Sequence, residues 1–190
     1  MKTALLIILL ACICAAPALA QDRVELWADR DMSSCTISEP VSPPIVQVHV
    51  FVTGPITANA VRFRAPKPDC WVGATWLGDR LEDGVLGLGN SQTDWSIAWY
   101  GGAGGCTARN TMPIYLGAIS YLISGQSQPC CKVEVLPAGQ FAFVDCGYLE
   151  HDLEPGKSVV VNPSESCGCQ SAVTLAVQPT SWGAVKALYR

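Results

Sequence analysis

The sequence predicts an all-β fold, an antiparallel β-sandwich of roughly ten strands with disulfides and at most one short C-terminal helix. Three observations support this prediction. Apolar and polar residues alternate over short stretches, which is the periodicity of strands with one buried face. The 17 glycines and 13 prolines are spread along the chain and separate these stretches. The 10 cysteines are enough for several covalent crosslinks.

The first twenty residues have the pattern of a secretory signal peptide. Lys2 supplies a positive charge, residues 4–16 form an apolar run, and Ala18 and Ala20 are the small residues of a cleavage site after Ala20. The run is shorter than the roughly 20 residues of a membrane span. The alternative export signal is a lipoprotein box ending at Cys12, in which this cysteine would be acylated. Export places the remaining cysteines in an oxidising compartment, where disulfides form.

Residues 21–190 have the length of a single domain with its own core. The sequence carries 12 Lys and Arg against 16 Asp and Glu, and it has no basic cluster. Nucleic acid and anionic membranes are therefore disfavoured as partners, because both require a basic surface. No later stretch is long enough to span a membrane, so we expect no transmembrane segment in the mature chain. Pro163 interrupts the one glycosylation sequon, at Asn162, which is consistent with a bacterial source.

Each strand is predicted from its local alternation. Residues 24–27 form a short first strand, and residues 45–52 form the clearest one, with its valines on one face. Residues 61–65 point their apolar side chains inward. Residues 70–77 form the next strand, which Gly78 and Asp79 end as a turn, and residues 78–92 are expected to be a polar connection. Further predicted strands are 95–99, 114–123, 132–135, 141–144, 158–161 and 172–177, and the short helix follows at 180–189.

Eight cysteines of the mature chain are disulfide candidates: Cys35, Cys70, Cys106, Cys130, Cys131, Cys146, Cys167 and Cys169. Chain order favours three pairings, which are Cys35 with Cys70, Cys106 with Cys130 or Cys131, and Cys146 with Cys167 or Cys169. Other connectivities stay open. A four-thiolate zinc site is disfavoured, because neither close cysteine pair has the usual ligand spacing and free thiolates do not persist in an oxidising compartment.

The sequence contains no catalytic motif. His49 and His151 are predicted to be solvated strand and loop residues, and no Gly-x-Ser-x-Gly presents a nucleophile. The acidic loop residues are expected to be solubilising rather than a hydrolytic pair. Asp29 and Asp31 begin like a calcium loop, but the sixth position lacks glycine, so only a weak Ca²⁺ site stays open. We therefore predict no catalytic residue, no cofactor and no metal site.

Trp95 and Trp99 are the candidate ligand-binding residues. They share one face of a predicted strand, about 13 Å apart at four strand steps. An exposed aromatic pair of this kind stacks on sugar rings. The favoured interpretation is nevertheless that both side chains belong to the core, since aromatic residues dominate the buried surface of small β domains.

Several short motifs resemble a set of exported proteins from little-studied Gram-negative bacterial phyla. These motifs are residues 26–29 with Cys35, residues 61–64 ahead of Cys70, and the closing stretch 177–189 with its Trp-Gly-x-x-Lys-x-Leu-Tyr pattern. The resemblance implies a signal-peptide-bearing β-sandwich without an established activity. The strand pattern is also loosely similar to a cohesin or carbohydrate-binding sandwich, which is an analogy of fold only.

We therefore predict an exported, non-enzymatic structural or interaction domain of the cell envelope or extracellular space, secreted or periplasmic, with a protein or glycan partner. The alternative is a carbohydrate-binding module that uses Trp95 and Trp99.

Overall fold

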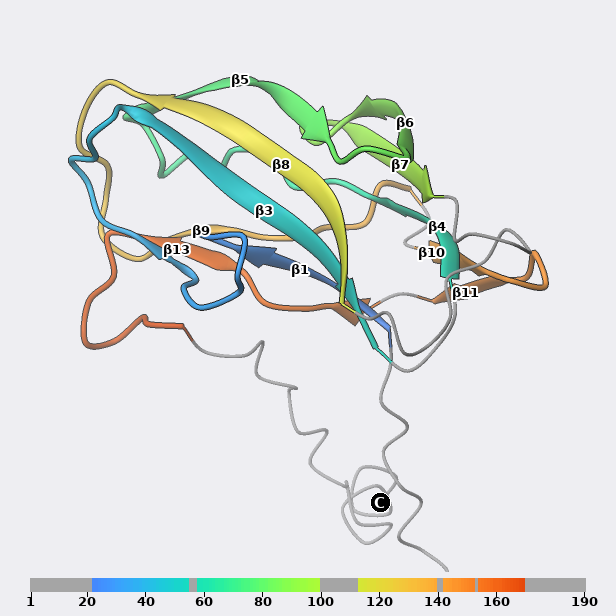
Figure 1. The fold of residues 1–190 in the computed structure, drawn as a ribbon. Helices are drawn as coiled ribbons and strands as arrows, with labels where there is room; N and C mark the ends of the chain where they lie inside the picture. Colours follow the sequence, from blue (N-terminus) through green and yellow to red (C-terminus); the bar gives the residue numbers. More distant parts are fainter. Residues whose placement is uncertain (1–21, 55–57, 100–112, 140–141, 153, 170–190) are drawn as a thin grey trace, which may run out of the picture.

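The computed structural model describes residues 22–54, 58–99, 113–139, 142–152 and 154–169. These residues form thirteen strands and no helix. Two five-stranded sheets pack as a sandwich, and a third sheet of three strands lies beside them (Figure 1). The predicted all-β sandwich is confirmed. The predicted strand 172–177, the C-terminal helix and the leader lie outside the described residues.

The first sheet has the order β12-β1-β3-β8-β5. Its strands are β12 (Glu154–Pro155), β1 (Arg23–Trp27), β3 (Ile45–Thr53), β8 (Ile114–Ile123) and β5 (Ala74–Leu81). The long strands β3 and β8 form its centre, in an antiparallel register that pairs Ile45 with Leu122. Only β12 runs parallel to its neighbour, β1.

The second sheet has the order β11-β10-β4-β7-β6, and the third has the order β2-β13-β9. The strands of the second sheet are β11 (Glu150–Asp152), β10 (Ala142–Asp145), β4 (Ala58–Phe63), β7 (Asp94–Trp99) and β6 (Val85–Asn90). The third consists of β2 (Thr36–Ile37), β13 (Val159–Val161) and β9 (Cys131–Val133). All pairs in the second sheet are antiparallel.

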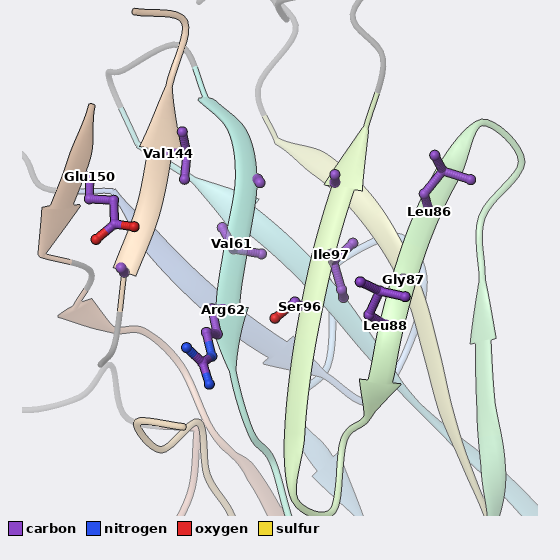
Figure 2. A pocket seen from close by; sticks show the side chains of 12 residues that line it. Val61, Arg62, Leu86, Gly87, Leu88, Ser96, Ile97, Val144 and Glu150 are labelled. Carbon is purple, nitrogen blue, oxygen red and sulfur yellow. The ribbon is translucent and has the colours of Figure 1, made fainter. Parts of the chain in front are cut away.

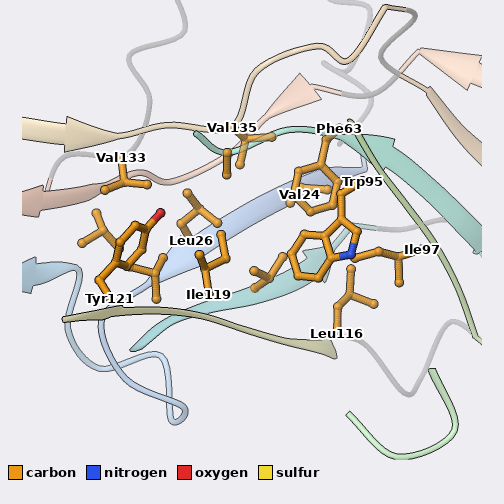
Figure 3. Close-up of a cluster of buried hydrophobic side chains, with 14 of the residues drawn as sticks. Val24, Leu26, Phe63, Trp95, Ile97, Leu116, Ile119, Tyr121, Val133 and Val135 are labelled. Atoms are coloured by element: carbon orange, nitrogen blue, oxygen red, sulfur yellow. The ribbon is translucent and has the colours of Figure 1, made fainter. Parts of the chain in front are cut away.

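The core lies between the sheets and contains the residues that alternation predicted (Figure 3). Val48, Val50 and Val52 of β3 are fully buried, as are Phe63 and its neighbour Val61 of β4. Phe63 packs on Trp95 of β7 with ring centroids 5.6 Å apart, and Trp71 packs on Tyr121 of β8 at 4.5 Å. Burying one large apolar side chain contributes roughly 1.5–3 kcal/mol, so these contacts dominate the stability of the sandwich.

The structure differs from the sequence prediction between residues 70 and 92. Residues 70–73 are turns, and the strand begins only at Ala74. Gly78 lies inside β5 at a bulge, where the register with β8 shifts. Residues 85–90, expected in a connection, form β6. The turn signal in residues 82–84 is confirmed, since these residues connect β5 to β6. The turn signals at Gly78 and in residues 87–90 were misleading, because glycine also marks bulges and close backbone approaches within strands.

The disulfides join Cys35 to Cys169, Cys70 to Cys131 and Cys130 to Cys167, and Cys146 is also disulfide-bonded. All three pairings suggested by chain order are therefore wrong. Cys106 lies outside the described residues. The physical reason is sheet topology, since the central strand β13 of the third sheet pairs with β2 and β9. The cysteines that flank these three strands are brought together across long stretches of sequence.

A buried carboxylate connects three loops. Glu39 is 8% exposed and accepts hydrogen bonds from Trp71 Nε1 at 2.7 Å, from the Ser127 backbone nitrogen at 2.7 Å and from Asn162 Nδ2 at 3.0 Å. Burial alone would raise the pKa of Glu39, but the donated hydrogen bonds outweigh it and hold the pKa below its usual value. The charged form is therefore the one that the fold stabilises.

We expect Glu39→Gln to lower the free energy of unfolding near pH 7 by about 2 kcal/mol, because hydrogen bonds to a charged group contribute about 1.5–3 kcal/mol. Since folding lowers the pKa of Glu39, its contribution is complete above the usual value of 4.5 and is lost as the pH falls toward the folded-state pKa. Urea unfolding near pH 7 and near pH 3 measures both effects. Glu134→Gln, at an exposed position directly after β9, is the control. An equal deficit at both pH values would contradict this role for the charge.

Candidate functional site

Trp95 and Trp99 are 1% and 8% exposed. Their shared strand face points into the core between the sheets, where Trp95 contacts Phe63 of the neighbouring strand β4 (Figure 3). Neither side chain is available to a ligand, which contradicts the carbohydrate-binding alternative that used them as surface residues. The large aromatic residues of β7 belong to the core because strand alternation buries every second side chain.

The two histidines lie in separate side-chain contacts. His49 Nδ1 is 3.0 Å from the Tyr115 hydroxyl, and burial lowers the pKa of His49. His151 Nε2 is 2.7 Å from Asp145 Oδ2, and its ring stacks on Phe143 at 4.8 Å. Both side chains are half-buried rather than fully solvated.

The candidate calcium residue Asp29 is engaged in a turn. Its carboxylate accepts hydrogen bonds from the Ser33 backbone nitrogen at 2.8 Å and from the Ser33 hydroxyl at 2.7 Å. Among the residues that the structure describes, no group of three or more His, Cys, Asp and Glu side chains could hold a metal ion. The weak calcium site at Asp29 and Asp31 stays an open alternative to the prediction of no metal site. The described residues also include no helix long and apolar enough to cross a membrane.

The outer face of the second sheet carries an apolar groove of about 600 Å³ (Figure 2). Its lining comes from all five strands of that sheet. The lining residues are Ala60, Val61, Arg62, Leu86, Gly87, Leu88, Ser96, Ile97, Ala98, Ala142, Val144 and Glu150. We call this surface the groove.

Strand register aligns the groove side chains in rows across the sheet. Val144 lies opposite Ala60, Ala60 opposite Ala98, and Ala98 opposite Leu86. This apolar row crosses four strands without a polar side chain. In the next row of that outer face, Ser96 lies between Arg62 and Leu88. The small side chains Ala60, Ser96 and Ala98 on β4 and β7 therefore form the floor of the groove. Leu86 and Leu88 on β6, which we call the leucine wall, border one side of this floor, and Val144 on β10 borders the other.

The leucine wall is unusually exposed. Leu86 and Leu88 are 76% and 78% exposed and alternate with Gly87 and Gly89. A Cβ at Gly87 would lie 2.7 Å from Leu81 Cδ1, and one at Gly89, where φ is +79°, would lie 2.0 Å from the Asp94 carbonyl oxygen. At Gly89 the backbone conformation and the Asp94 carbonyl oxygen leave room only for glycine, whereas at Gly87 the end of the Leu81 side chain would have to shift. Both large side chains of this glycine-leucine stretch consequently point outward over the groove.

Charged side chains border the groove at one end and along one side. Arg62 Nε is 3.0 Å from Asp94 Oδ1, and a second hydrogen bond from the same guanidinium reaches Asp94 Oδ2. This bidentate pair lowers the pKa of Asp94 through the hydrogen bond and the charge of Arg62. On the other side, β11 presents Glu150 and Asp152, both exposed. The border is therefore net acidic on the β11 side.

Sequence reasoning missed the groove. Ala60, Ser96 and Ala98 are small residues without a chemical signature, and Leu86 and Leu88 fall in a stretch predicted to be a connection. The only signal was the Leu-Gly-Leu-Gly spacing itself, which has the period of a strand.

The chain was compared with known proteins. No protein-family model matches it, and no curated protein matches it. Among solved structures, it is similar to a type I cohesin from Clostridium thermocellum in a cohesin–dockerin complex, with 11% identity, 74% of this chain and 99% of the other covered, and a TM-score of 0.46. It is also similar to a type III cohesin module from a cell-surface anchoring scaffoldin of Ruminococcus flavefaciens, with 12% identity, coverage of 78% and 91%, and a TM-score of 0.44.

Leu86→Ser and Leu88→Ser should each change the free energy of unfolding by less than about 0.5 kcal/mol, because both side chains are exposed in the folded state. Ile97→Ala, on the buried face of the adjacent strand, should cost about 3 kcal/mol by leaving a cavity. The leucine double variant should also bind less Nile red, a neutral apolar dye. Denaturant unfolding and dye fluorescence measure these effects, and strong destabilisation by the leucine variants would show that β6 packs differently.

Proposed function

We propose that this chain is an exported, non-enzymatic interaction domain that binds a helix of a protein partner in the groove. Support for export comes from the leader pattern of residues 1–20 and from the disulfides, which persist in oxidising compartments.

The observation that carries this proposal is the leucine wall beside a floor of small side chains. Two adjacent outward leucines, each more than three-quarters exposed, border a groove of about 600 Å³. Contiguous exposed apolar surface with a polar border marks a site of interaction, because leaving it in water costs free energy. A binding partner would bury both leucines and fill the space above Ala60 and Ala98.

The shape of the groove favours a helix over an extended segment. Its floor strands β4 and β7 each pair with strands on both sides, so their backbone groups are already hydrogen-bonded within the sheet. An extended segment lying on them would bury its own amides without partners, at a cost of about 1–3 kcal/mol for each. A helix satisfies its backbone internally. The walls on β6 and β10 are three strand spacings apart, about 14 Å, which admits a helix about 10 Å across.

The border charges specify the polar side of this partner. Glu150 and Asp152 are exposed on β11, and no ion pair with another described side chain involves either of them. Arg62 is already paired with Asp94. The partner helix should therefore carry Lys or Arg on the side that faces β11, where complementary charge increases the association rate and selects the orientation.

Photo-crosslinking tests the binding surface. A benzophenone side chain at Leu88 should crosslink a protein in the exported fraction of the producing cells, and Ala98→Arg in the same molecule should abolish the product by filling the floor. The matched control places the benzophenone at Leu122, an exposed leucine on the first sheet. Equal products from both positions, or a Leu88 product that Ala98→Arg leaves unchanged, would contradict the groove as the binding site.

Synthetic peptides test the helical form of the ligand. An amphipathic peptide of about twenty residues, with leucines at helical spacing and lysines flanking them, should shift the methyl resonances of Leu86 and Leu88 in an NMR titration. A peptide that differs from it only by two central prolines cannot form that helix and should shift them far less. Replacing the flanking lysines by glutamates should weaken binding in low salt. Equal affinity for the helical and proline peptides would contradict the helix.

A further inference from the structure

The turn between β10 and β11 presents two large apolar side chains to solvent. Tyr148 is 82% exposed and Leu149 is 62% exposed. We call residues 146–149 the hairpin tip. Acidic side chains of β11 follow it directly. Adjacent exposed aromatic and aliphatic residues at the end of a hairpin form a projecting apolar surface, distinct from the recessed groove.

The hairpin tip is held in one conformation by Asp145. The carboxylate of Asp145 accepts hydrogen bonds from the Gly147 and Leu149 backbone nitrogens at 2.8 and 2.9 Å. His151 Nε2 contacts the same carboxylate at 2.7 Å. The Tyr148 backbone nitrogen also donates to the Asp145 carbonyl at 3.0 Å, and Cys146 is disulfide-bonded. A surface ordered in this way loses little conformational entropy on binding.

The backbone of the tip gives no reason for an aromatic residue at position 148. Tyr148 has a φ of 63°, in the left-handed region that costs roughly 1–2 kcal/mol for a residue with a Cβ. Glycine or asparagine would form the same turn with less strain. The tyrosine side chain also contributes little to the core, since most of it is in solvent. Backbone strain combined with exposure therefore indicates a role outside the fold.

The hairpin tip is continuous with the groove. Val144, at the β10 wall, precedes the tip in sequence, and Glu150, which also lines the groove, follows it. The hairpin tip thus extends from the end of the groove that contains Val144 and Ala60. Arg62 and Asp94 border the opposite end. The two outward rows are two residues apart along the strands, about 7 Å, or little more than one helical turn. A helix of several turns must extend beyond them.

We infer that the hairpin tip is a second contact for the same partner helix, with Tyr148 packing on the part of the helix that extends past the groove. This inference rests on the proposed function and adds that the affinity depends on the length of the bound helix. Tyrosine suits the role, because it supplies a large rigid contact area at low entropic cost and is enriched among the residues that dominate binding energy. Leu149 and the acidic start of β11 extend the contact on the basic side of the helix.

Peptide length tests this inference. Two helical peptides with the same leucine and lysine pattern, of about ten and about twenty residues, span one and a half or three nanometres as helices. The longer peptide should bind the wild-type domain at least about tenfold more tightly than the shorter one, the scale expected for an anchor residue. Tyr148→Gly should remove this gain and leave the affinity for the short peptide unchanged. Tyr148→Phe should keep it.

Two controls separate binding from folding. Thermal unfolding of Tyr148→Gly should be no earlier than that of the wild type, since glycine relieves the left-handed strain. Leu149→Ser provides a second variant of the tip that keeps Tyr148, and it should reduce the gain in part. Ile45→Ser, at an exposed position on the first sheet, should leave both affinities unchanged.

The outcomes distinguish the two proposals. If the longer peptide binds more tightly and Tyr148→Gly keeps the full gain, the inference about the hairpin tip is overturned while the groove remains the site. If Ala98→Arg leaves both affinities unchanged but Tyr148→Gly lowers them, the groove is wrong and the tip alone binds. If neither peptide binds the wild-type domain, both proposals are overturned.

Discussion

Asp79 and Ser91 hold the edge of the second sheet against the first. Asp79, on β5, accepts hydrogen bonds from the Ser91 backbone nitrogen and hydroxyl, both at 2.7 Å, and from Trp76 Nε1 at 3.2 Å. Ser91 is fully buried, and its carbonyl oxygen accepts a bond from the Ala65 backbone nitrogen at 2.7 Å. These bonds attach the turn between β6 and β7 to strand β5 of the first sheet. The position of the leucine wall, and with it the groove, depends on this connection.

The same alternation that builds the core also builds the candidate site. On β4 and β7, Val61, Phe63, Trp95 and Ile97 point inward, so their neighbours must point outward. The inward residues are large and apolar, so the alternation in the sequence indicates them. Their outward neighbours Ala60, Ser96 and Ala98 are small, and this difference in size between the two faces makes the outer one hollow. The inner face could therefore be predicted from the sequence, whereas the hollow appears only when the register is known.

Residues 85–90 show why local sequence signals failed at the site. A run with two glycines indicates a turn in isolation, because glycine has a low strand propensity. In the fold, Gly89 is required by its positive φ and by the close approach of the Asp94 carbonyl oxygen, and Gly87 packs against the Leu81 side chain. The prediction of disulfide pairing failed for a related reason. Cys35 and Cys169 are separated by 134 residues and come together only through the third sheet. In both cases a tertiary contact determined the local structure.

The acidic side of the groove also bears on which partner the exposed leucines select. Two copies that met through this face with β11 against β11 would bring together Glu150 and Asp152 of each, in a chain with a net charge of −4. Like charges at a contact cost free energy and slow association. Arg62 compensates only in part, because it acts on the charge of Glu150 but is already paired with Asp94 through two hydrogen bonds. Self-association in that arrangement is thus disfavoured, while a helix with basic residues gains from the same charges, so the border favours the proposed basic helix over a second copy placed in this way.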